Sequence, residues 1–382
     1  MNGITNRSQL RHYLEQTMLR TYESLYERGQ LEFEKNLVKS YLIEAHPEEA
    51  DTPASILRFV RALLRGPHTA AEATEDETLI ALRGPDGIEG YLDVLDRRFW
   101  LLHSTSRADA LDQFVERFLV SRPGLDRAWF DGGLLLDLTA LGDLRGFGVR
   151  FNMPEYGEDL GLSEDEREDF RTFGDAVYIK IRSVRARRFL DELTKQRYFR
   201  RTRAIYSIKT KLREEGAGVG GAGALVDFTN AGKATARGTS FDRYQEFLLT
   251  ARNLYARRIE SLEAMRIRYL ASDQWDNGFS VAGEPAQIDL SPDVSNFPAF
   301  VAQLLNCAHP YRLAGVPHYY SPTYVHIRAV DLHMGQPVGL EVTPSFARVY
   351  LPFGSCANIL TRLHTNLQSN YAATTEMTPA QA

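Results

Sequence analysis

The sequence predicts an α+β protein with a helical N-terminal region, a central, mostly antiparallel sheet that carries a basic face and one long helix, and a C-terminal α+β unit. With 382 residues the chain exceeds the roughly 250 to 300 residues at which a single core stops growing. Apolar residues recur at helical spacing up to about residue 140 and afterwards alternate with polar ones, as they do in half-buried strands. The change of period indicates separate helical and sheet-containing regions.

The composition is ordinary for a soluble globular protein, because 43% of the residues are hydrophobic and 25% are charged. The sequence has no run of about 18 apolar residues that would span a bilayer, and its N-terminus lacks the apolar segment of a signal peptide. Cys307 and Cys356 are too few for a disulfide framework or a four-cysteine zinc site. We therefore expect a cytoplasmic protein without a membrane partner.

Residues 1–140 are expected to form the mainly helical region. Apolar side chains repeat at helical spacing through Leu10, Leu14 and Met18, and again through residues 31–42. A short strand is expected before the turn at residues 84–87, and another amphipathic helix over residues 107–120.

Residues 141–275 are expected to form the central domain. Alternating apolar and polar residues predict three strands, at 144–151, 175–183 and 203–213. A helix is expected over residues 184–198. The glycine-rich loop at 216–223 precedes a hairpin with its turn at Asn230 to Gly232, and Ser240 caps a long amphipathic helix that ends near residue 270.

Residues 276–370 are expected to form the C-terminal α+β domain. Its predicted elements are a helix that Ser355 opens, an earlier helix at 296–306, and strands at 323–333, 338–343 and 346–352. The polar tail at 371–382 is expected to be disordered.

Charge is strongly segregated along a chain whose formal net charge is only -5. Residues 155–170 carry eight acids against one arginine, whereas residues 180–213 carry thirteen Lys or Arg against Asp191 and Glu192. Because electric fields act locally, the basic block matters more for a ligand than the net charge does.

The predicted strands each present one basic side, because side chains on a strand alternate between its two faces. In residues 203–213 the even positions are mostly apolar, whereas Lys209 and Lys211 occupy odd positions. Together with aromatic rings from nearby segments, these sides supply the candidate binding residues: Arg150, Tyr178, Lys180, Arg182, Tyr198, Phe199, Arg200, Arg201, Arg203, Lys209, Lys211, Arg213, Lys233 and Arg237.

Such a set of cations suits the phosphate backbone of a nucleic acid or a polyphosphate, and exposed rings stack on unpaired bases. We therefore expect a nucleic-acid-binding subunit of a multi-component intracellular assembly, with nucleic acid and a protein as partners, non-catalytic by itself and without a cofactor. In one alternative the acidic block at 155–170 neutralises the basic strands. The chain is then a protein-interaction scaffold.

Three segments resemble nucleotide- or RNA-binding motifs but depart from them. Residues 216–221 fit G-x-G-x-x-G, yet a strand pattern follows where that motif requires a helix. Residues 230–234 contain Gly-Lys, but Ala234 stands in place of the Ser or Thr that binds magnesium. Residues 145–151 approach the RNA-recognition octamer and lack its second aromatic residue.

The alternative enzymatic reading places a metal in the C-terminal hairpin. With a three-residue loop at Gly335, Asp331 faces Glu341, so that Asp331, His333 and Glu341 converge; with a two- or four-residue loop Asp331 faces Leu340. The converged set would hold Mg²⁺ or Mn²⁺ in a metal-dependent phosphodiesterase or nuclease. The segment is similar to the Asp and Glu-x-Lys pattern of restriction-type nucleases, with Thr343 in the place of the Lys.

One further pair, Arg98 and His103, has the spacing of Arg and His in some helical ribonucleases. The aromatic residues between them, Phe99 and Trp100, favour a core segment instead.

Overall fold

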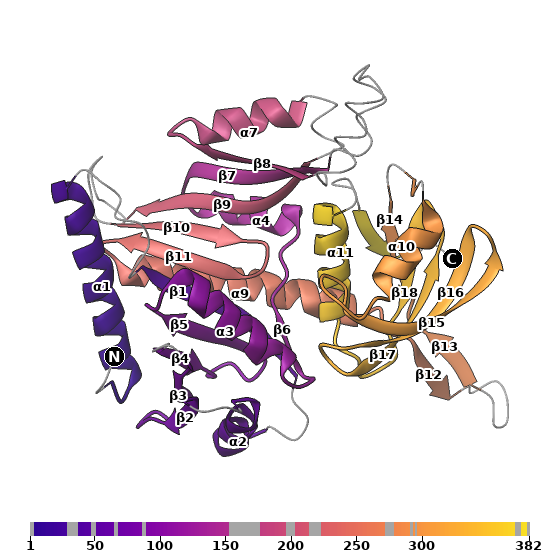
Figure 1. Cartoon of the computed structure of the whole chain (residues 1–382), viewed down its shortest axis with the longest axis horizontal. Helices are drawn as coiled ribbons and strands as arrows, with labels where there is room; N and C mark the ends of the chain where they lie inside the picture. The colour runs from indigo at the N-terminus through magenta and orange to yellow at the C-terminus, as the bar shows by residue number, and fades with distance from the viewer. Residues whose placement is uncertain are drawn as a thin grey trace. The chain divides into compact units, whose positions relative to one another are not determined.

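The computed structural model describes residues 4–28, 37–46, 51–64, 68–85, 89–152, 176–195, 203–213, 223–271, 279–290, 293–294, 296–370 and 376–379. The chain forms two compact units, each assembled from several stretches of sequence. The first unit holds Met1–Ala128, Leu138–Asp143 and Lys209–Ala256, and the second holds Trp129–Asp137, Leu144–Ile208 and Arg257–Ala382. Helices and antiparallel strands occur in both units (Figure 1), which confirms the predicted α+β class.

The first unit is built around a sheet with the strand order β2-β3-β4-β5-β1-β11-β10-β9, in which β6 also pairs with β1. Its strands are β1 (Val38–Ala45), β2 (Ala70–Ala73), β3 (Leu79–Arg83), β4 (Glu89–Asp93), β5 (Phe99–Ser104), β6 (Leu125–Arg127), β10 (Gly223–Thr229), β11 (Lys233–Gly238) and the second half of β9 (Arg203–Arg213). β1 lies at the centre, and all eight of its residues are buried.

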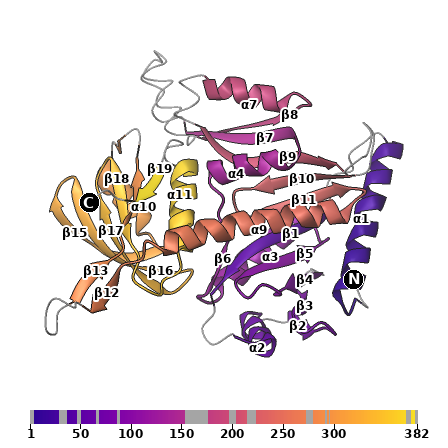
Figure 2. The ribbon, with the colours of Figure 1, turned by 180° about the vertical axis from the view of Figure 1, so that it is seen from behind.

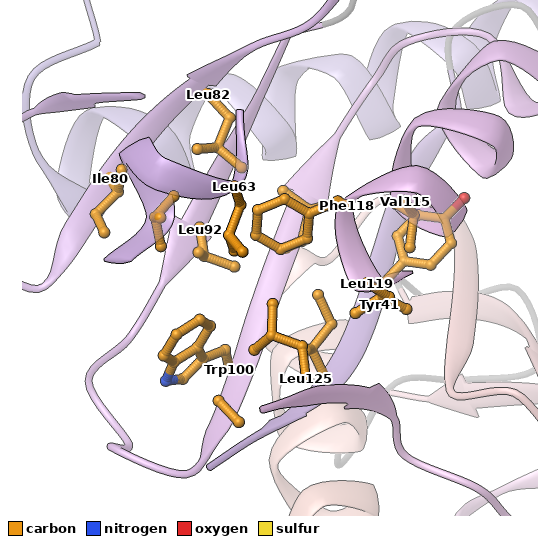
Figure 3. Packing of buried hydrophobic residues seen from close by; sticks show 14 of the residues in the cluster. Tyr41, Leu63, Ile80, Leu82, Leu92, Trp100, Val115, Phe118, Leu119 and Leu125 are labelled. Carbon is orange, nitrogen blue, oxygen red and sulfur yellow. The ribbon is translucent and has the colours of Figure 1, made fainter. Parts of the chain in front are cut away.

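One face of this sheet packs against α2 (Pro53–Leu63) and α3 (Ala108–Val120). Thr52 caps α2 and Pro53 occupies its first turn, so the helix begins where its sequence favours it. Figure 3 shows Trp100 and Leu92 of the strands close to Leu63 of α2 and Phe118 of α3. This cluster is the hydrophobic core of the first unit.

The opposite face of the sheet meets α1 (Arg7–Arg28) and the first part of α9 (Phe241–Glu263), which runs across the strands in Figure 2. Polar groups buried on this face are bonded to α9. The Tyr244 hydroxyl donates to Ser40 Oγ at 2.7 Å, and Ser40 Oγ lies 2.7 Å from His103 Nδ1.

A second buried polar cluster on this face involves Arg98. Tyr255 of α9 donates to Glu44 Oε2 at 2.7 Å, and Arg98 donates to Glu44 Oε1 at 2.8 Å. Because Arg98 is held by Glu44 and His103 by Ser40, the two side chains do not form a ribonuclease pair. The interpretation of Arg98 and His103 as a catalytic pair is therefore wrong, and the interpretation of this segment as part of the core is correct.

In the second unit, β7 (Asp143–Asn152) pairs antiparallel with β8 (Ala176–Arg182), and the strand order is β9-β7-β8. α4 (Gly132–Leu138) and η2 (Thr139–Leu141) precede β7, and α7 (Ala186–Lys195) follows β8 and lies beside it in Figures 1 and 2. Phe147 and Val149 are buried. Where its side chains are described, the segment that approaches the RNA-recognition octamer is therefore a packed strand, and its aromatic residue Phe147 is not exposed.

The second unit also contains an antiparallel sheet with the order β15-β16-β17-β18-β14-β19, which we call the C-terminal sheet. Its strands are β14 (Ala286–Asp289), β15 (Leu313–Ser321), β16 (Tyr324–Asp331), β17 (Gln336–Val342), β18 (Phe346–Tyr350) and β19 (Glu376–Pro379). The same unit holds the hairpin of β12 (Arg268–Ala271) and β13 (Phe279–Ala282), and the helices α10 (Phe297–Leu304) and α11 (Asn358–Asn370). Burial alternates along β16, so one face of the sheet is core and the other is open.

The sequence located most elements after residue 140, including the long helix α9 and the hairpin of β10 and β11. It missed most of the sheet in the N-terminal region, where the described residues form the strands β1 to β6 beside the helices. β1 and β5 are buried throughout, on both faces, so their sequences lack the alternation of apolar and polar residues that predicts a half-buried strand. The prediction of a disordered tail was also wrong for residues 376–379, which form β19 and pair with β14.

Neither compact unit coincides with a predicted domain, because each draws on segments that are far apart in the sequence. The acidic block at 155–170 lies outside the residues that the structure describes, and so does most of the glycine-rich loop. Of the helices that are described, none has the length and apolar character needed to cross a bilayer.

Gly148 provides a test of the packing in β7. A Cβ atom at this position would stand 2.4 Å from Cζ of the Tyr206 ring, whereas a Cβ at Gly339 of β17 would meet only Tyr350 Cβ, at 3.5 Å. We expect Gly148→Ala to lower the free energy of unfolding by about 1 to 3 kcal/mol, as overpacking does. Gly339→Ala is the matched control and should change it by less than about 0.5 kcal/mol. Urea unfolding of both variants checks this, and equal effects would contradict the packing described.

His103 provides a test of acid stability. Burial lowers the pKa of His103 to about 4, and the charge of Asp93 opposes only part of this shift. The unfolded chain takes up a proton near pH 6.5, well before the folded chain does, so stability is lost as the pH falls from about 6.5 to 4. Between pH 7 and 4.5 the unfolding free energy of the wild type should fall by on the order of 2 kcal/mol more than that of His103→Gln. Identical pH dependence in urea titrations of the two proteins would refute this.

Candidate functional site

The predicted basic residues divide between the two units. Lys211 and Arg237 lie half-buried in the first unit, with Lys209 and Lys233. The second unit holds Arg150, Tyr178, Lys180 and Arg182. Arg203 and Arg213 lie at the ends of β9, where the structure does not describe their side chains, and Tyr198, Phe199, Arg200 and Arg201 fall outside the described residues.

Lys209 and Lys233 have structural partners and do not form an open cationic surface. Lys209 is only 7% exposed, and its Nζ lies 2.8 Å from Asp227 Oδ2. Lys233 Nζ lies 2.6 Å from Asp112 Oδ2 and also stands over the Tyr41 ring. The expectation that the odd side of β9 is exposed is therefore wrong for Lys209, because both sides of this strand are covered.

The remaining predicted residues do share one side of the β7–β8 pair. The register places Arg150 opposite Tyr178, Gly148 opposite Lys180 and Gly146 opposite Arg182. Tyr178 is 58% exposed, and the Arg150 guanidinium lies 5.3 Å from the centre of its ring. Arg150 Nη1 also donates to Asn370 Oδ1 at 2.7 Å, so this arginine fixes the ring in position. Tyr178, Lys180 and Arg182 thus share one side of β8 as predicted, but Ile179 on the other side is 40% exposed and does not belong to a core.

Further exposed cations follow in the chain directly after β8. Arg182, Arg185 and Arg188 are exposed, and their side chains make no hydrogen bond or ion pair with any residue that the structure describes. Lys180 and Arg187 are exposed beside them. We call the group of Arg150, Tyr178, Lys180, Arg182, Arg185, Arg187 and Arg188 the basic edge.

The predicted metal site does not form. A four-residue turn joins β16 and β17, and Glu341 pairs with His326, so Glu341 lies on the opposite face from Asp331. Asp331 is buried and paired with the guanidinium of Arg362 in α11. No group of three or more His, Cys, Asp or Glu in the described part of the chain is placed to hold a metal ion. Of the two registers that the sequence left open, the structure has the one with a four-residue turn, in which Asp331 and Glu341 lie on opposite faces.

On its open side the C-terminal sheet instead gathers a hydrogen-bonded cluster around Glu341. Tyr324 donates from its hydroxyl to Glu341 Oε1 at 2.6 Å, and Tyr350 donates to Oε2 at 2.9 Å. Arg348 Nη1 lies 3.6 Å from the same carboxylate. The Tyr324 hydroxyl is also 2.6 Å from His326 Nε2, and because its single proton goes to Glu341, His326 must be the donor there.

The protonation states in this cluster follow from its hydrogen bonds. Partial burial raises the pKa of Glu341, but the bonds from Tyr324 and Tyr350 and the charge of Arg348 outweigh it, so this pKa lies below its usual value. The bond to Glu341 raises the pKa of Tyr324 to about 12. Burial, followed by the bond to Glu341, raises the pKa of Tyr350. At neutral pH the cluster therefore holds an ionised carboxylate between two neutral phenols.

Exposed rings and cations surround the cluster. The ring of Tyr320, which is 60% exposed, lies 4.6 Å from the His326 ring and 5.0 Å from the His318 ring, measured between ring centres. Arg328 is exposed, and its neighbour across the strands is Gly339, which has no side chain to cover it. We call this set the C-terminal face: His318, Tyr320, Tyr324, His326, Arg328, Glu341, Arg348 and Tyr350.

The sequence contained a signal for this face that the metal reading overlooked. Tyr324, His326 and Arg328 stand two positions apart, and this spacing places all three on one side of a strand. His318 joins them because the register sets it directly opposite His326. Glu341 joins them through a register that depends on the length of the turn.

The ion pair of Lys209 can be tested as a structural element. Because both partners are largely buried, Lys209→Met should lower the free energy of unfolding by about 2 to 4 kcal/mol. The double variant Lys209→Met, Asp227→Leu should recover part of this loss, since it leaves no unmatched charge. Lys211→Met, at the half-buried position nearby, is the control for removing a lysine. If the unfolding free energy of Lys209→Met equals that of the Lys211→Met control, the ion pair of Lys209 with Asp227 does not stabilise the fold.

Comparison with known proteins identifies the family of this chain. The chain is 25% identical to the uncharacterized protein MJECL33 of Methanocaldococcus jannaschii, in a match that covers 97% of this chain and 93% of that protein. No solved structure matches the chain. The family model described as MJECL33-like protein matches residues 1–382. The chain therefore belongs to the MJECL33-like protein family.

Proposed function

We propose that the protein binds nucleic acid through the basic edge. The supporting observation is the presence of Arg182, Arg185 and Arg188 as exposed guanidinium groups without a described protein partner. Guanidinium groups of this kind bind phosphate oxygens in pairs of hydrogen bonds. Together with Lys180, they gather four exposed positive charges within residues 180–188, and such a concentration of charge suits a phosphate backbone.

The ring of Tyr178 suggests that the bound nucleic acid is single-stranded. An aromatic side chain that is 58% exposed on a basic surface offers a stacking partner to an unpaired base. In duplex nucleic acid the base faces are stacked on one another and are closed to such a ring. Arg150, which is anchored by Asn370, and the ring of Tyr206 both contact the Tyr178 ring, and this restraint reduces the entropy lost when a base stacks on it.

A protein partner is the second candidate for the same edge. β8 is the last strand in its sheet order, and the apolar side chains of Ile179, Val184 and Phe189 are exposed on it and beside it. The last strand of a sheet, with apolar side chains exposed on it, can accept a strand from a partner protein. The chain would then act as one subunit of an assembly, as the sequence led us to expect.

A cytoplasmic location completes the proposal. Cys307 is exposed, Cys356 is buried, and both are free thiols. Free thiols are typical of proteins in reducing compartments.

Fluorescence anisotropy with a labelled single-stranded oligonucleotide tests the binding proposal. The wild type should bind at low salt, with an affinity that falls steeply as salt is added. A triple variant, Arg182→Glu, Arg185→Glu and Arg188→Glu, should bind at least about tenfold more weakly and should show a flatter salt dependence, because it forms fewer phosphate contacts.

The matched control carries the same change of charge in the first unit, where Arg20, Arg97 and Arg122 are also exposed arginines. Replacing these three with Glu should leave most of the affinity intact. If the wild type does not bind at low salt, or if both triple variants lose affinity equally, the basic edge is not the binding surface. Copurification of a stoichiometric protein with no nucleic acid would support the second candidate instead.

A further inference from the structure

We propose that the C-terminal face binds a nucleotide, with the ring of Tyr320 stacked on the base and the guanidinium of Arg328 bound to the phosphate. A nucleotide always carries a planar ring and an anion, and these two side chains supply a partner for each. The site shares no residue with the basic edge. The inference therefore goes beyond the proposed function and does not rest on it.

A β-bulge places Tyr320 at this site. β15 pairs with β16 residue by residue up to Tyr319, and the pairing resumes one step out of register at Ser321. Tyr320 is the extra residue between them and has no partner across the strands. Bulges of this kind are common at sheet edges, where they redirect a side chain. Tyr320 is 60% exposed, so its ring offers a surface on which a base can stack.

Neighbouring rings hold Tyr320 in position. The centre of its ring lies 4.6 Å from that of His326, 5.0 Å from that of His318 and 5.7 Å from that of Tyr324. These contacts restrict the ring before a ligand arrives. Less conformational entropy is therefore lost when a base stacks on it.

Arg328 is available to bind the phosphate. It is exposed, and it makes no hydrogen bond or ion pair with any residue that the structure describes. Its neighbours across the strands, Val316 and Gly339, have no polar side chain that could occupy the guanidinium. The donors of Arg328 are thus left for an anion from outside the chain, and a guanidinium can give two parallel hydrogen bonds to phosphate oxygens.

The surface beside Arg328 is low because Gly339 has no side chain. A Cβ atom built on Gly339 would meet only Tyr350 Cβ, at 3.5 Å. No other described atom crowds the position above this glycine. A phosphate can therefore approach Arg328 from the side of β17.

The spacing of the two side chains suits one nucleotide. The ring of Tyr320 packs on His326, and Arg328 stands two positions after His326 on the same side of β16. Residues spaced in this way lie roughly 6.7 Å apart along a strand. The sugar that joins a base to its phosphate bridges a similar distance, so one nucleotide can reach both side chains.

The charge balance of the face also favours an anion. Glu341 is the acidic member of the C-terminal face, and Arg348 Nη1 lies 3.6 Å from its carboxylate. The hydroxyls of Tyr324 and Tyr350 donate to the same carboxylate. Because Glu341 is offset in this way, the charge of Arg328 is left to attract a phosphate.

Isothermal titration calorimetry of the full-length protein with AMP, adenosine and inorganic phosphate tests the inference. AMP should bind more tightly than either of its parts, because only AMP contacts both side chains. Tyr320→Ala should weaken the binding of AMP at least about tenfold, as the loss of a stacking ring does, and Tyr320→Phe should keep most of the affinity. Arg328→Ala should lower the affinity for AMP to that for adenosine and leave the binding of adenosine unchanged.

Two variants serve as matched controls. Tyr319→Ala removes an exposed tyrosine that pairs with the buried Val325 and so lies on the other side of β15. Arg97→Ala removes an exposed arginine of the first unit. Both should bind AMP as the wild type does. Thermal unfolding of every variant distinguishes lost binding from lost folding.

Gly339→Val tests the space beside Arg328 without removing any contact. Its branched side chain should occupy the position where the phosphate approaches and should weaken the binding of AMP, while the binding of adenosine stays unchanged. Wild-type affinity for AMP in a folded Gly339→Val protein would contradict the position proposed for the phosphate.

Three results would overturn the inference: no binding of AMP at low salt, equal affinities for AMP in Tyr320→Ala and Tyr319→Ala, or wild-type affinity in both Tyr320→Ala and Arg328→Ala. The triple arginine variant of the basic edge should still bind AMP, and loss of AMP binding in that variant alone would also overturn the inference. If AMP binds as described but the labelled oligonucleotide does not, only the proposed function fails.

A tetranucleotide of adenylate identifies the source of the nucleotide. If it binds the C-terminal face no more tightly than AMP does, the ligand is a free nucleotide. If it binds much more tightly, and Tyr320→Ala removes the gain, the nucleotide belongs to a single strand. Either result supports the site, whereas a tetranucleotide and AMP that are both unaffected by Tyr320→Ala would exclude it.

Discussion

The register of the hairpin between β16 and β17 determines what the C-terminal face contains. Asp331 ends β16, accepts hydrogen bonds from the backbone N–H groups of His333 and Met334 at 3.2 Å each, and pairs with the buried Arg362. Gly335 closes the turn at a φ of +68°, which favours glycine, and its N–H donates to the Asp331 carbonyl at 2.7 Å. A slip of one residue would move Glu341 to the buried face and leave His326 and Tyr324 without a carboxylate.

The protein thus uses its charged residues in two ways. Inside each unit they are matched, as in the pairs of Lys209 with Asp227 and of Arg362 with Asp331, and removing one partner would leave a charge in a poorly solvated place. On the surface some are paired, as Arg11 is with Asp242, while others, such as Arg182 and Arg328, make no contact with a described partner and can neutralise a ligand. A surplus of Lys and Arg in the sequence therefore does not by itself identify a binding surface.

Alternation in the sequence was sufficient to find β7, β8 and β16 and to place Lys180 with Arg182 on one side of a strand. It did not reveal that Lys209 is buried, because the residue that pairs with it, Asp227, lies on another strand whose position depends on the whole sheet. It also did not reveal β1, which is covered on both faces and has no alternating pattern. The cluster around Glu341 could not be predicted from the sequence, because the residues of the turn between β16 and β17 are compatible with a three-residue or a four-residue loop. Only the contacts of Asp331 with the turn and with Arg362 select the four-residue loop.

Ultraviolet cross-linking of a single-stranded, uridine-rich RNA to the full-length protein, followed by mass spectrometry of the peptides, tests most directly where the RNA lies. The account predicts cross-links to Tyr178 on the basic edge, because its ring is 58% exposed and lies beside Arg150. Cross-links confined to other parts of the chain, with none on β8, would contradict it.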